Sequence, residues 1–229
     1  MAAFLFVEQH QRRPRVFRDR LNPNSYNDDE LRRKYRLTRD AITDLCDSLD
    51  ASIAPKTNRN HAVSTNLQVL RALRYYATGS FQELLGDSHG LSKATLSRII
   101  LRVTNAIVRT HSGKISFPRT AAERTDCKQG FHNVAGFPNV LGCVDGTLIP
   151  IKTPHDDEHL YVSRKGGHAL NVQVVCDSGL RFTNAVVRYP GSTHDSFIWN
   201  NCSLNEKFST GQITDGWLLG DSGYDFAAY

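Results

Sequence analysis

The sequence has few cysteines and no pairing pattern among them. Its five cysteines are odd in number, widely scattered and never spaced as C-x-x-C. A disulfide framework or a structural zinc site needs regular spacings of that kind, so neither is expected. Free thiols in a reducing compartment are the simpler interpretation.

Long apolar runs are also missing. No stretch approaches the roughly 20 apolar residues of a membrane span, and the opening MAAFLFV is too short for a signal-peptide core and runs straight into Glu8. There is no internal repeat and no low-complexity tract. With 40% hydrophobic residues, the chain is expected to be globular, away from membranes, with one large domain or a small domain beside a medium one.

Charge is unevenly distributed along the chain. Residues 1–110 hold 18 Lys and Arg against 11 Asp and Glu, a balance of +7, whereas residues 111–229 hold 10 against 12, a balance of −2. A basic segment favours a polyanion such as DNA through counterion release, although a solvated positive face gives the same asymmetry.

The first 110 residues have helical patterns. An Arg-dense arm at 12–20 precedes a predicted helix over 28–49, and Pro55 ends that element. Apolar spacing then predicts three helices between 64 and 107, the second of them short. The third opens with small and basic residues, among them Lys93 and Arg98, as a recognition helix in a helix-turn-helix would. A plain helical bundle remains the alternative.

The pattern changes after a polar connector at 111–136. Two apolar runs, at 140–144 and 148–151, lie on either side of the turn signal Asp145-Gly146. Two β-rich runs, at 170–175 and 182–187, lie on either side of the turn signal at 177–179. A helix over about 193–208 leads to the run Trp217–Leu219. The order β, β, β, α, β predicts strands that meander antiparallel before a helix crosses over to the last one. We therefore predict an arm and helix over 1–60, a helix-turn-helix region over 61–110, the connector, and an α/β domain over 137–229.

Two aspartates follow apolar runs in that last domain. Asp145 and Asp221 each end a predicted strand, and if the strands are neighbours the carboxylates meet at one edge of the sheet. Paired carboxylates suit Mg²⁺ or Mn²⁺, and two such ions about 4 Å apart can clamp both oxygens of a phosphodiester displacement. The alternative for Asp145 is a hairpin turn, because Asp-Gly is common there.

Other polar residues have competing explanations. Asp195 falls in the first turn of the predicted helix, where the helix dipole alone favours an acid, and His194 can serve structure or contact phosphate. The acidic run at 156–158 and Asp177 are explained by a solvated loop and a turn. GDSG at 220–223 resembles a serine protease loop but lacks a matching histidine and aspartate context.

Five blocks in one order resemble the PIF/Harbinger transposase family and its domesticated nucleases. They are GFHNVAGFP at 130–138, GCVDGT at 142–147, YVSRKGGHALNVQ at 161–173, PGSTHDS at 190–196 and LLGDSGY at 218–224. Together they cover about a hundred residues and are far more specific than any one alone. The tri-helical segment also resembles the DNA-binding region of that family, with weaker motifs.

This resemblance implies an RNase H-like mixed sheet, preceded by an all-α helix-turn-helix region, that hydrolyses DNA phosphodiester bonds with Mg²⁺ or Mn²⁺. It implies that Asp145 is the first metal ligand and Asp221 the second main catalytic aspartate, with Asp195 either an accessory ligand or a helix-start residue that faces the site. The candidate DNA contacts are basic residues of the tri-helical segment and of the third and fourth blocks: Lys93, Arg98, Arg164, Lys165, His168 and His194.

One departure from the family leaves two functions open. The family has a further glutamate on a later helix, and this sequence ends at Tyr229 before such a segment. We therefore expect either a metal-dependent DNA endonuclease whose 229 residues cut DNA weakly, or a catalytically inactive DNA-binding adaptor that retains the fold. The resemblance further implies a nuclear location, with the cytoplasm as a second compartment, and a Myb-like partner protein.

Overall fold

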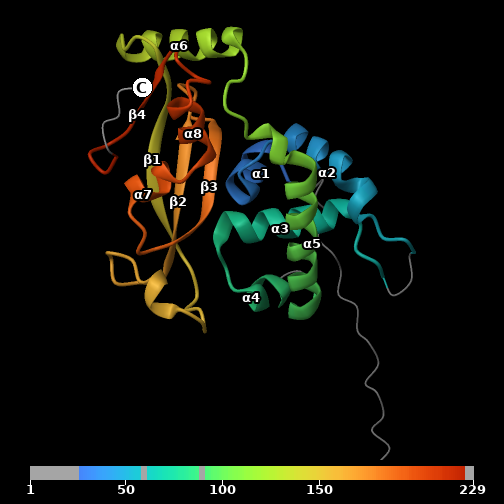
Figure 1. Cartoon of the computed structure of the whole chain (residues 1–229). Helices are drawn as coiled ribbons and strands as arrows, with labels where there is room; N and C mark the ends of the chain where they lie inside the picture. Colours follow the sequence, from blue (N-terminus) through green and yellow to red (C-terminus); the bar gives the residue numbers. More distant parts are fainter. Residues whose placement is uncertain (1–25, 58–60, 88–90, 225–229) are drawn as a thin grey trace, which may run out of the picture. The chain divides into compact units, whose positions relative to one another are not determined.

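The computed structural model describes residues 26–57, 61–87 and 91–224. The basic arm predicted at 12–20 therefore lies outside the described residues. The chain divides into two compact units, Met1–Ser112 and Gly113–Tyr229 (Figure 1). Within the described residues, no helix is both long enough and apolar enough to cross a membrane.

The first unit is entirely helical. Its helices are α1 (Asp28–Tyr35), α2 (Arg39–Ile53), α3 (Thr65–Thr78), α4 (Gln82–Asp87) and α5 (Lys93–His111). One buried apolar cluster unites α1, α2, α3 and α5, with Leu49, Val69 and Val103 fully buried in it. The three helices predicted between 64 and 107 are confirmed, including the short middle one.

The single helix predicted over 28–49 is wrong, because two helices occupy that segment. Arg36 takes a left-handed conformation with φ of 64° and ends α1, and the Thr38 side chain then accepts a hydrogen bond from the Ala41 amide to begin α2. The end before Pro55 is confirmed, since α2 stops at Ile53.

The second unit is a four-stranded mixed sheet with helices. Its elements in chain order are α6 (Ala121–Ala135), β1 (Val140–Pro150), a 3₁₀ turn η3 (Glu158–Tyr161), β2 (Ala169–Cys176), β3 (Phe182–Pro190), α7 (Asp195–Asn200), α8 (Ser203–Ser209) and β4 (Trp217–Leu219). The strand order is β3-β2-β1-β4. β1, β2 and β3 pair antiparallel, whereas β4 pairs parallel to β1 after the helical crossover. The predicted RNase H-like mixed sheet preceded by helices is thus confirmed.

Helices bury the sheet through separate apolar clusters. Trp199 of α7 and Leu204 and Phe208 of α8 pack against Leu141 and Val175 of the sheet, and Figure 1 shows both helices over its face. Burial of side chains this large is the main stabilising term for the unit, at about 1.5–3 kcal/mol for each. The crossover helix predicted over 193–208 is two short helices, because the Cys202 sulfur accepts the Asn205 amide and caps α8.

The connector predicted at 111–136 contains the helix α6, which the sequence pattern did not predict. A capping box between Thr120 and Glu123 begins α6, and Gly136 ends it with φ of 71°. The helix buries only Cys127 and Phe131, which pack on Val140. A helix with so few buried positions has a weak amphipathic pattern, which explains the missed prediction.

The apolar run at 140–144 was expected to end at Asp145 and Gly146, but β1 continues through them to Pro150 and so includes most of the second run at 148–151. Asp145 and Gly146 pair with Val174 and Gln173 in the middle of β1. The prediction that Asp145 ends a strand, and the alternative of a hairpin turn there, are both wrong. The turn predicted at Asp177 is confirmed, because its carboxylate accepts the amides of Gly179 and Arg181.

Candidate active site

The parallel pairing of β1 with β4 sets the positions of the first two aspartates. Cys143 pairs with Leu219, and two residues later come Asp145, still within β1, and Asp221, just beyond the end of β4. Both aspartates are exposed. The sheet therefore brings two carboxylates from segments more than seventy residues apart to the same end of the β1–β4 pair.

The Asp195 carboxylate packs against Gly146, the residue that follows Asp145 in β1. A Cβ atom added to Gly146 would lie 2.3 Å from Asp195 Oδ1, so the carboxylate rests directly against the backbone of β1. Only glycine leaves that space empty. The first residue of α7 is thus held one position away from Asp145 along the strand.

Asn171 of β2 fixes the orientation of Asp195. Its Nδ2 donates to Asp195 Oδ1 at 2.8 Å and to the Thr193 carbonyl at 2.8 Å. Both partners are acceptors, so the amide nitrogen must face them. Asn171 is 5% exposed, and its Oδ1 is buried without a hydrogen-bond partner in the described part of the chain.

Asp221 faces the same space as Asp195. A Cβ atom added to Gly223 would lie 3.0 Å from Asp221 Oδ1 and 3.6 Å from Asp195 Oδ2, so both carboxylates point at one position. The Tyr224 hydroxyl lies beside them, buried and without a hydrogen-bond partner among the described residues. Burial first, then the negative charges of Asp195, Asp145 and Asp221, raise the pKa of that hydroxyl. All three carboxylates therefore contribute to the raised pKa of the Tyr224 hydroxyl.

These oxygen donors have the chemistry that Mg²⁺ or Mn²⁺ requires, although their side chains do not form a finished ligand cluster. Across residues 26–57, 61–87 and 91–224, no three His, Cys, Asp or Glu side chains converge closely enough to hold an ion by themselves. Asp195 Oδ2 and Asp221 Oδ1 nevertheless both lie beside Gly223, so two carboxylates of the predicted metal set are close together. The Tyr224 hydroxyl is buried and has no hydrogen-bond partner among the described residues.

A pocket of about 310 Å³ opens beside Asp195. The residues that line it come from β1, the hairpin at 162–168, β2 and the loop before α7, namely Gly146, Leu148, Val162, Ser163, Arg164, Asn171, Gly191, Ser192, Thr193, His194 and Asp195. Two of the predicted DNA contacts, Arg164 and His194, therefore lie at this pocket, and both are exposed.

The other predicted DNA contacts lie elsewhere. Lys165 is exposed on the same hairpin but does not line the pocket. The ring of His168 contacts Glu158 Oε1 at 2.9 Å and Thr153 Oγ1 at 3.2 Å, so its described role is to hold the hairpin. Lys93 and Arg98 are exposed at the start of α5 in the first unit, and Lys93 Nζ lies 3.9 Å from Glu83 Oε2.

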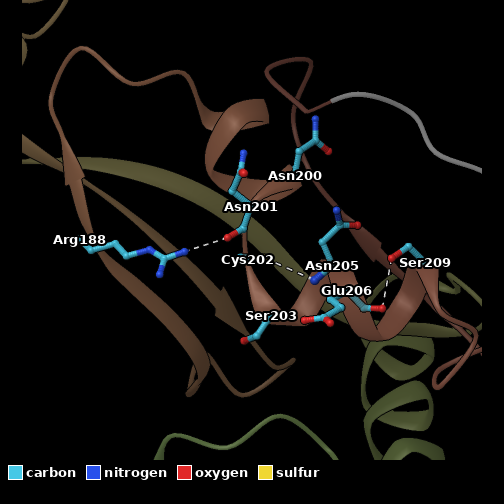
Figure 2. Close-up of a pocket in the computed structure, with 8 residues that line it drawn as sticks. All are labelled: Arg188, Asn200, Asn201, Cys202, Ser203, Asn205, Glu206 and Ser209. Carbon is cyan, nitrogen blue, oxygen red and sulfur yellow. Dashed lines mark hydrogen bonds between the residues drawn. The ribbon is translucent and has the colours of Figure 1, made fainter.

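A larger hollow of about 470 Å³ lies between β3 and the α7–α8 corner (Figure 2). Its polar groups largely satisfy one another, since Arg188 donates to the Asn201 carbonyl at 2.9 Å and Ser209 to the Glu206 carbonyl at 3.1 Å. None of the three aspartates lines it. Size alone therefore does not identify the site, and the smaller pocket beside Asp195 is the better candidate.

Sequence reasoning did not single out Gly146, Asn171 and Tyr224, although all three lie in blocks that carry the family resemblance. For Gly146 and Tyr224, position within a block that also holds a candidate aspartate was the available signal, whereas the block that holds Asn171 has no aspartate and only candidate DNA contacts. Their roles depend on contacts made across the fold.

Comparison with known proteins identifies related sequences. Residues 144–229 match the family described as DDE superfamily endonuclease. The chain is 39% identical over 206 residues to the protein named "Putative nuclease HARBI1" from Rattus norvegicus, and 38% identical over 206 residues to its counterpart from Homo sapiens. Each match covers 90% of this chain and 59% of the relative, so the chain spans less than two thirds of their length.

A more distant relative comes from a plant. "Protein ALP1-like" from Arabidopsis thaliana is 21% identical over 210 residues, which is 83% of this chain and 51% of that protein. No solved structure matches the chain. The resemblance to Harbinger transposase-derived nucleases is confirmed by these matches.

Proposed function

We propose that the second unit is the catalytic part of a metal-dependent endonuclease that hydrolyses phosphodiester bonds of DNA. The observation that carries this proposal is that Asp195 Oδ2 and Asp221 Oδ1 both lie beside Gly223, with Asp145 on the strand that pairs with β4, within a segment that matches DDE superfamily endonucleases. The similarity to proteins named as nucleases over 90% of the chain supports the same reaction class.

Asp145, Asp195 and Asp221 would hold the divalent cations. Bound there, Mg²⁺ or Mn²⁺ would neutralise charge on the phosphate and lower the pKa of a water molecule. The chain's own contribution is placement: Asn171 fixes one carboxylate by a 2.8 Å hydrogen bond, and Gly146 lets that carboxylate approach β1. Arg164 at the pocket can pair with a phosphate oxygen of the DNA.

In this proposal, the first unit supplies DNA affinity through α5 and its basic balance, and the protein acts in the nucleus, with the cytoplasm as a second location. A Myb-like protein is proposed as its partner. Imaging of the tagged protein tests the location, and co-precipitation with a Myb-like candidate tests the partner.

The second candidate function is a DNA-binding adaptor that does not cut. It is favoured by the lack of a finished three-ligand cluster within the part of the chain that the structure describes. Both candidates predict DNA binding, so cleavage separates them.

The deciding experiment is plasmid nicking with Mg²⁺ or Mn²⁺, by this chain and by a form extended to the full length of its relatives. We expect metal-dependent nicking by the extended form, reduced at least about a hundredfold in Asp145→Asn, Asp195→Asn and Asp221→Asn, because misplacing the reacting groups by about 1 Å costs that much. Asp156→Asn, in an exposed loop, is the matched control and should cut normally. Nicking that survives Asp145→Asn would show that the site is wrong, and DNA binding without nicking by either form would support the adaptor.

A further inference from the structure

The pocket beside Asp195 has the build of a small-ligand site. Its volume of about 310 Å³ falls at the lower end of the range typical of such sites, which is about 300–1,000 Å³. Its lining combines Asp195 and Asn171, from α7 and β2, with Arg164 and Ser163 from the hairpin; these two groups are called its acidic and its basic end. An acidic end and a basic end thus share one space.

Asn171 points to a ligand that carries an N–H group. The residue is 5% exposed and lines the pocket, and both of its described hydrogen bonds use Nδ2. Its Oδ1 is buried without a partner in the described residues. A buried acceptor left unpaired is costly, so it calls for a donor that the described side chains do not supply.

The basic end is rigid and unpaired. The Gly166 amide donates to the Ser163 carbonyl at 2.8 Å and the Ser163 amide to the Gly167 carbonyl at 2.9 Å, so the turn that carries Arg164 is pinned. No hydrogen bond or ion pair holds the Arg164 guanidinium within the described chain, and the side chain is exposed. A free guanidinium on a pinned turn suits a phosphate group.

Apolar side chains form part of the wall between these two ends. Leu148 is half-buried and Val162 is 41% exposed, so each presents hydrocarbon to the pocket. Flat nucleobases combine an apolar face with N–H donors on the edge, and each of the four DNA bases has at least one such donor. A nucleotide therefore matches the pocket's acceptor, its walls and its cation together.

We propose that this pocket binds one unpaired nucleotide of the DNA, next to the catalytic aspartates. An N–H of its base donates to Asn171 Oδ1, the base lies against Leu148 and Val162, and Arg164 binds its phosphate. The inference rests on the proposed nuclease function for its biological meaning. It implies that the enzyme acts where a base is unstacked, so the structure of the DNA and not only its sequence selects the cleavage position.

The test is nuclear magnetic resonance titration of the whole chain with each deoxynucleoside 5′-monophosphate, with deoxyribose 5-phosphate and with inorganic phosphate. We expect the nucleotides to bind roughly tenfold tighter than either control ligand, since a base adds a hydrogen bond and apolar contact. The amides that shift should be those of residues 162–168 and 190–195.

Variants assign the two ends of the pocket. Arg164→Ala should weaken nucleotide binding roughly tenfold through loss of a charge-assisted hydrogen bond, whereas Lys207→Ala on α8, the matched control, should change it less than twofold. Val162→Ser should reduce the preference for nucleotides over deoxyribose 5-phosphate without affecting inorganic phosphate. Equal binding of nucleotide and inorganic phosphate, shifts confined to other residues, or equal effects of Arg164→Ala and Lys207→Ala would overturn the proposal.

Failure of the nuclease and failure of the pocket are distinguishable. Asp145→Asn should abolish nicking, because Asp145 is a proposed metal ligand. It should leave nucleotide binding unchanged, because Asp145 does not line the pocket. A chain that never cuts but binds nucleotides as expected would refute the nuclease alone. A chain that cuts and binds nucleotides no better than phosphate would refute the pocket alone.

Discussion

At the scale of single residues, the candidate site depends on a glycine, which leaves room for a carboxylate. Gly146 lies in β1, where a side chain would usually be favourable, yet a Cβ there would come within 2.3 Å of Asp195 Oδ1. Real Cβ atoms do not approach an oxygen so closely, so the carboxylate would have to move. Its hydrogen bond from Asn171 Nδ2 would then be strained or lost.

We predict that Gly146→Ala reduces Mn²⁺ affinity by roughly tenfold or more while the protein still folds, because removing support for a metal-binding carboxylate costs about 10- to 100-fold. Mn²⁺ titration followed by electron paramagnetic resonance, with thermal unfolding alongside, measures both effects. The matched control is Gly167→Ala, since nothing lies within 4 Å of a Cβ added there. Unchanged Mn²⁺ affinity in Gly146→Ala would remove Asp195 from the metal site.

At the scale of elements, α6 holds the loop that leads into β4. Asp215 contacts Arg124 Nε and Lys128 Nζ of α6, each at 2.8 Å. The hydrogen bond from Lys128 is the largest effect on the pKa of Asp215 and lowers it; burial, the next largest, raises it, and the charges of Arg124 and Lys128 add to the lowering, so the pKa is lowered overall. The Trp217 amide adds a hydrogen bond to the Asn139 carbonyl at 3.0 Å. Together these contacts place β4, and with it Asp221, beside β1.

We predict that Asp215→Asn lowers the free energy of unfolding at pH 7 by up to about 1 kcal/mol, a modest value because the Asp215 side chain is 39% exposed. Since the folded pKa lies below the unfolded one, the stabilisation is complete above about pH 3.9 and is lost as the pH falls through the folded pKa. Urea unfolding at pH 7 and at pH 3 checks this: the difference should shrink at low pH. Asp126→Asn, exposed on α6, should show no such dependence, and a pH-independent deficit in Asp215→Asn would rule out the ion pair as its cause.

At the scale of the whole molecule, charge separates the two units. Residues 1–112 hold the +7 balance and residues 113–229 the acidic one, which supports our proposal that DNA affinity and catalysis belong to different units. Lys93 and Arg98 lie exposed at the beginning of α5, after the short helix α4, in the order that a helix-turn-helix requires.

We predict that DNA affinity of the chain falls steeply with salt, and that Lys93→Ala and Arg98→Ala each reduce the slope of log K against log[salt] by about 1, the contribution of one phosphate contact. The measurement is fluorescence anisotropy of labelled DNA at salt concentrations of about 50 to 200 mM, a range over which such slopes change the affinity strongly. Lys56→Ala, exposed beyond the end of α2, serves as the control with an unchanged slope. Binding insensitive to salt would refute the helix-turn-helix as the DNA contact.

Local patterns in the sequence were sufficient for most elements of the fold. The helices over 64–107, the turn at Asp177 and the order of three meandering strands, helices and a returning strand all followed from spacings within about twenty residues. Where a boundary depended on one cap, the pattern was insufficient: Arg36 divides one predicted helix and Cys202 another. Periodicity persists across such a break because both halves still face one core.

By itself, the sequence determined the class of the fold and its charge division, because residue type and short-range period carry that information. The three aspartates were singled out by the family resemblance, and only the tertiary structure decided how they are arranged. Asn171 reaches Asp195 across 24 residues, and Asp145 lies in mid-strand opposite Val174. A shift of one residue in the register of β1 would turn Asp145 to the other face of the sheet. Register follows from pairing and packing over the whole unit, and so it cannot be read from the local pattern around Asp145.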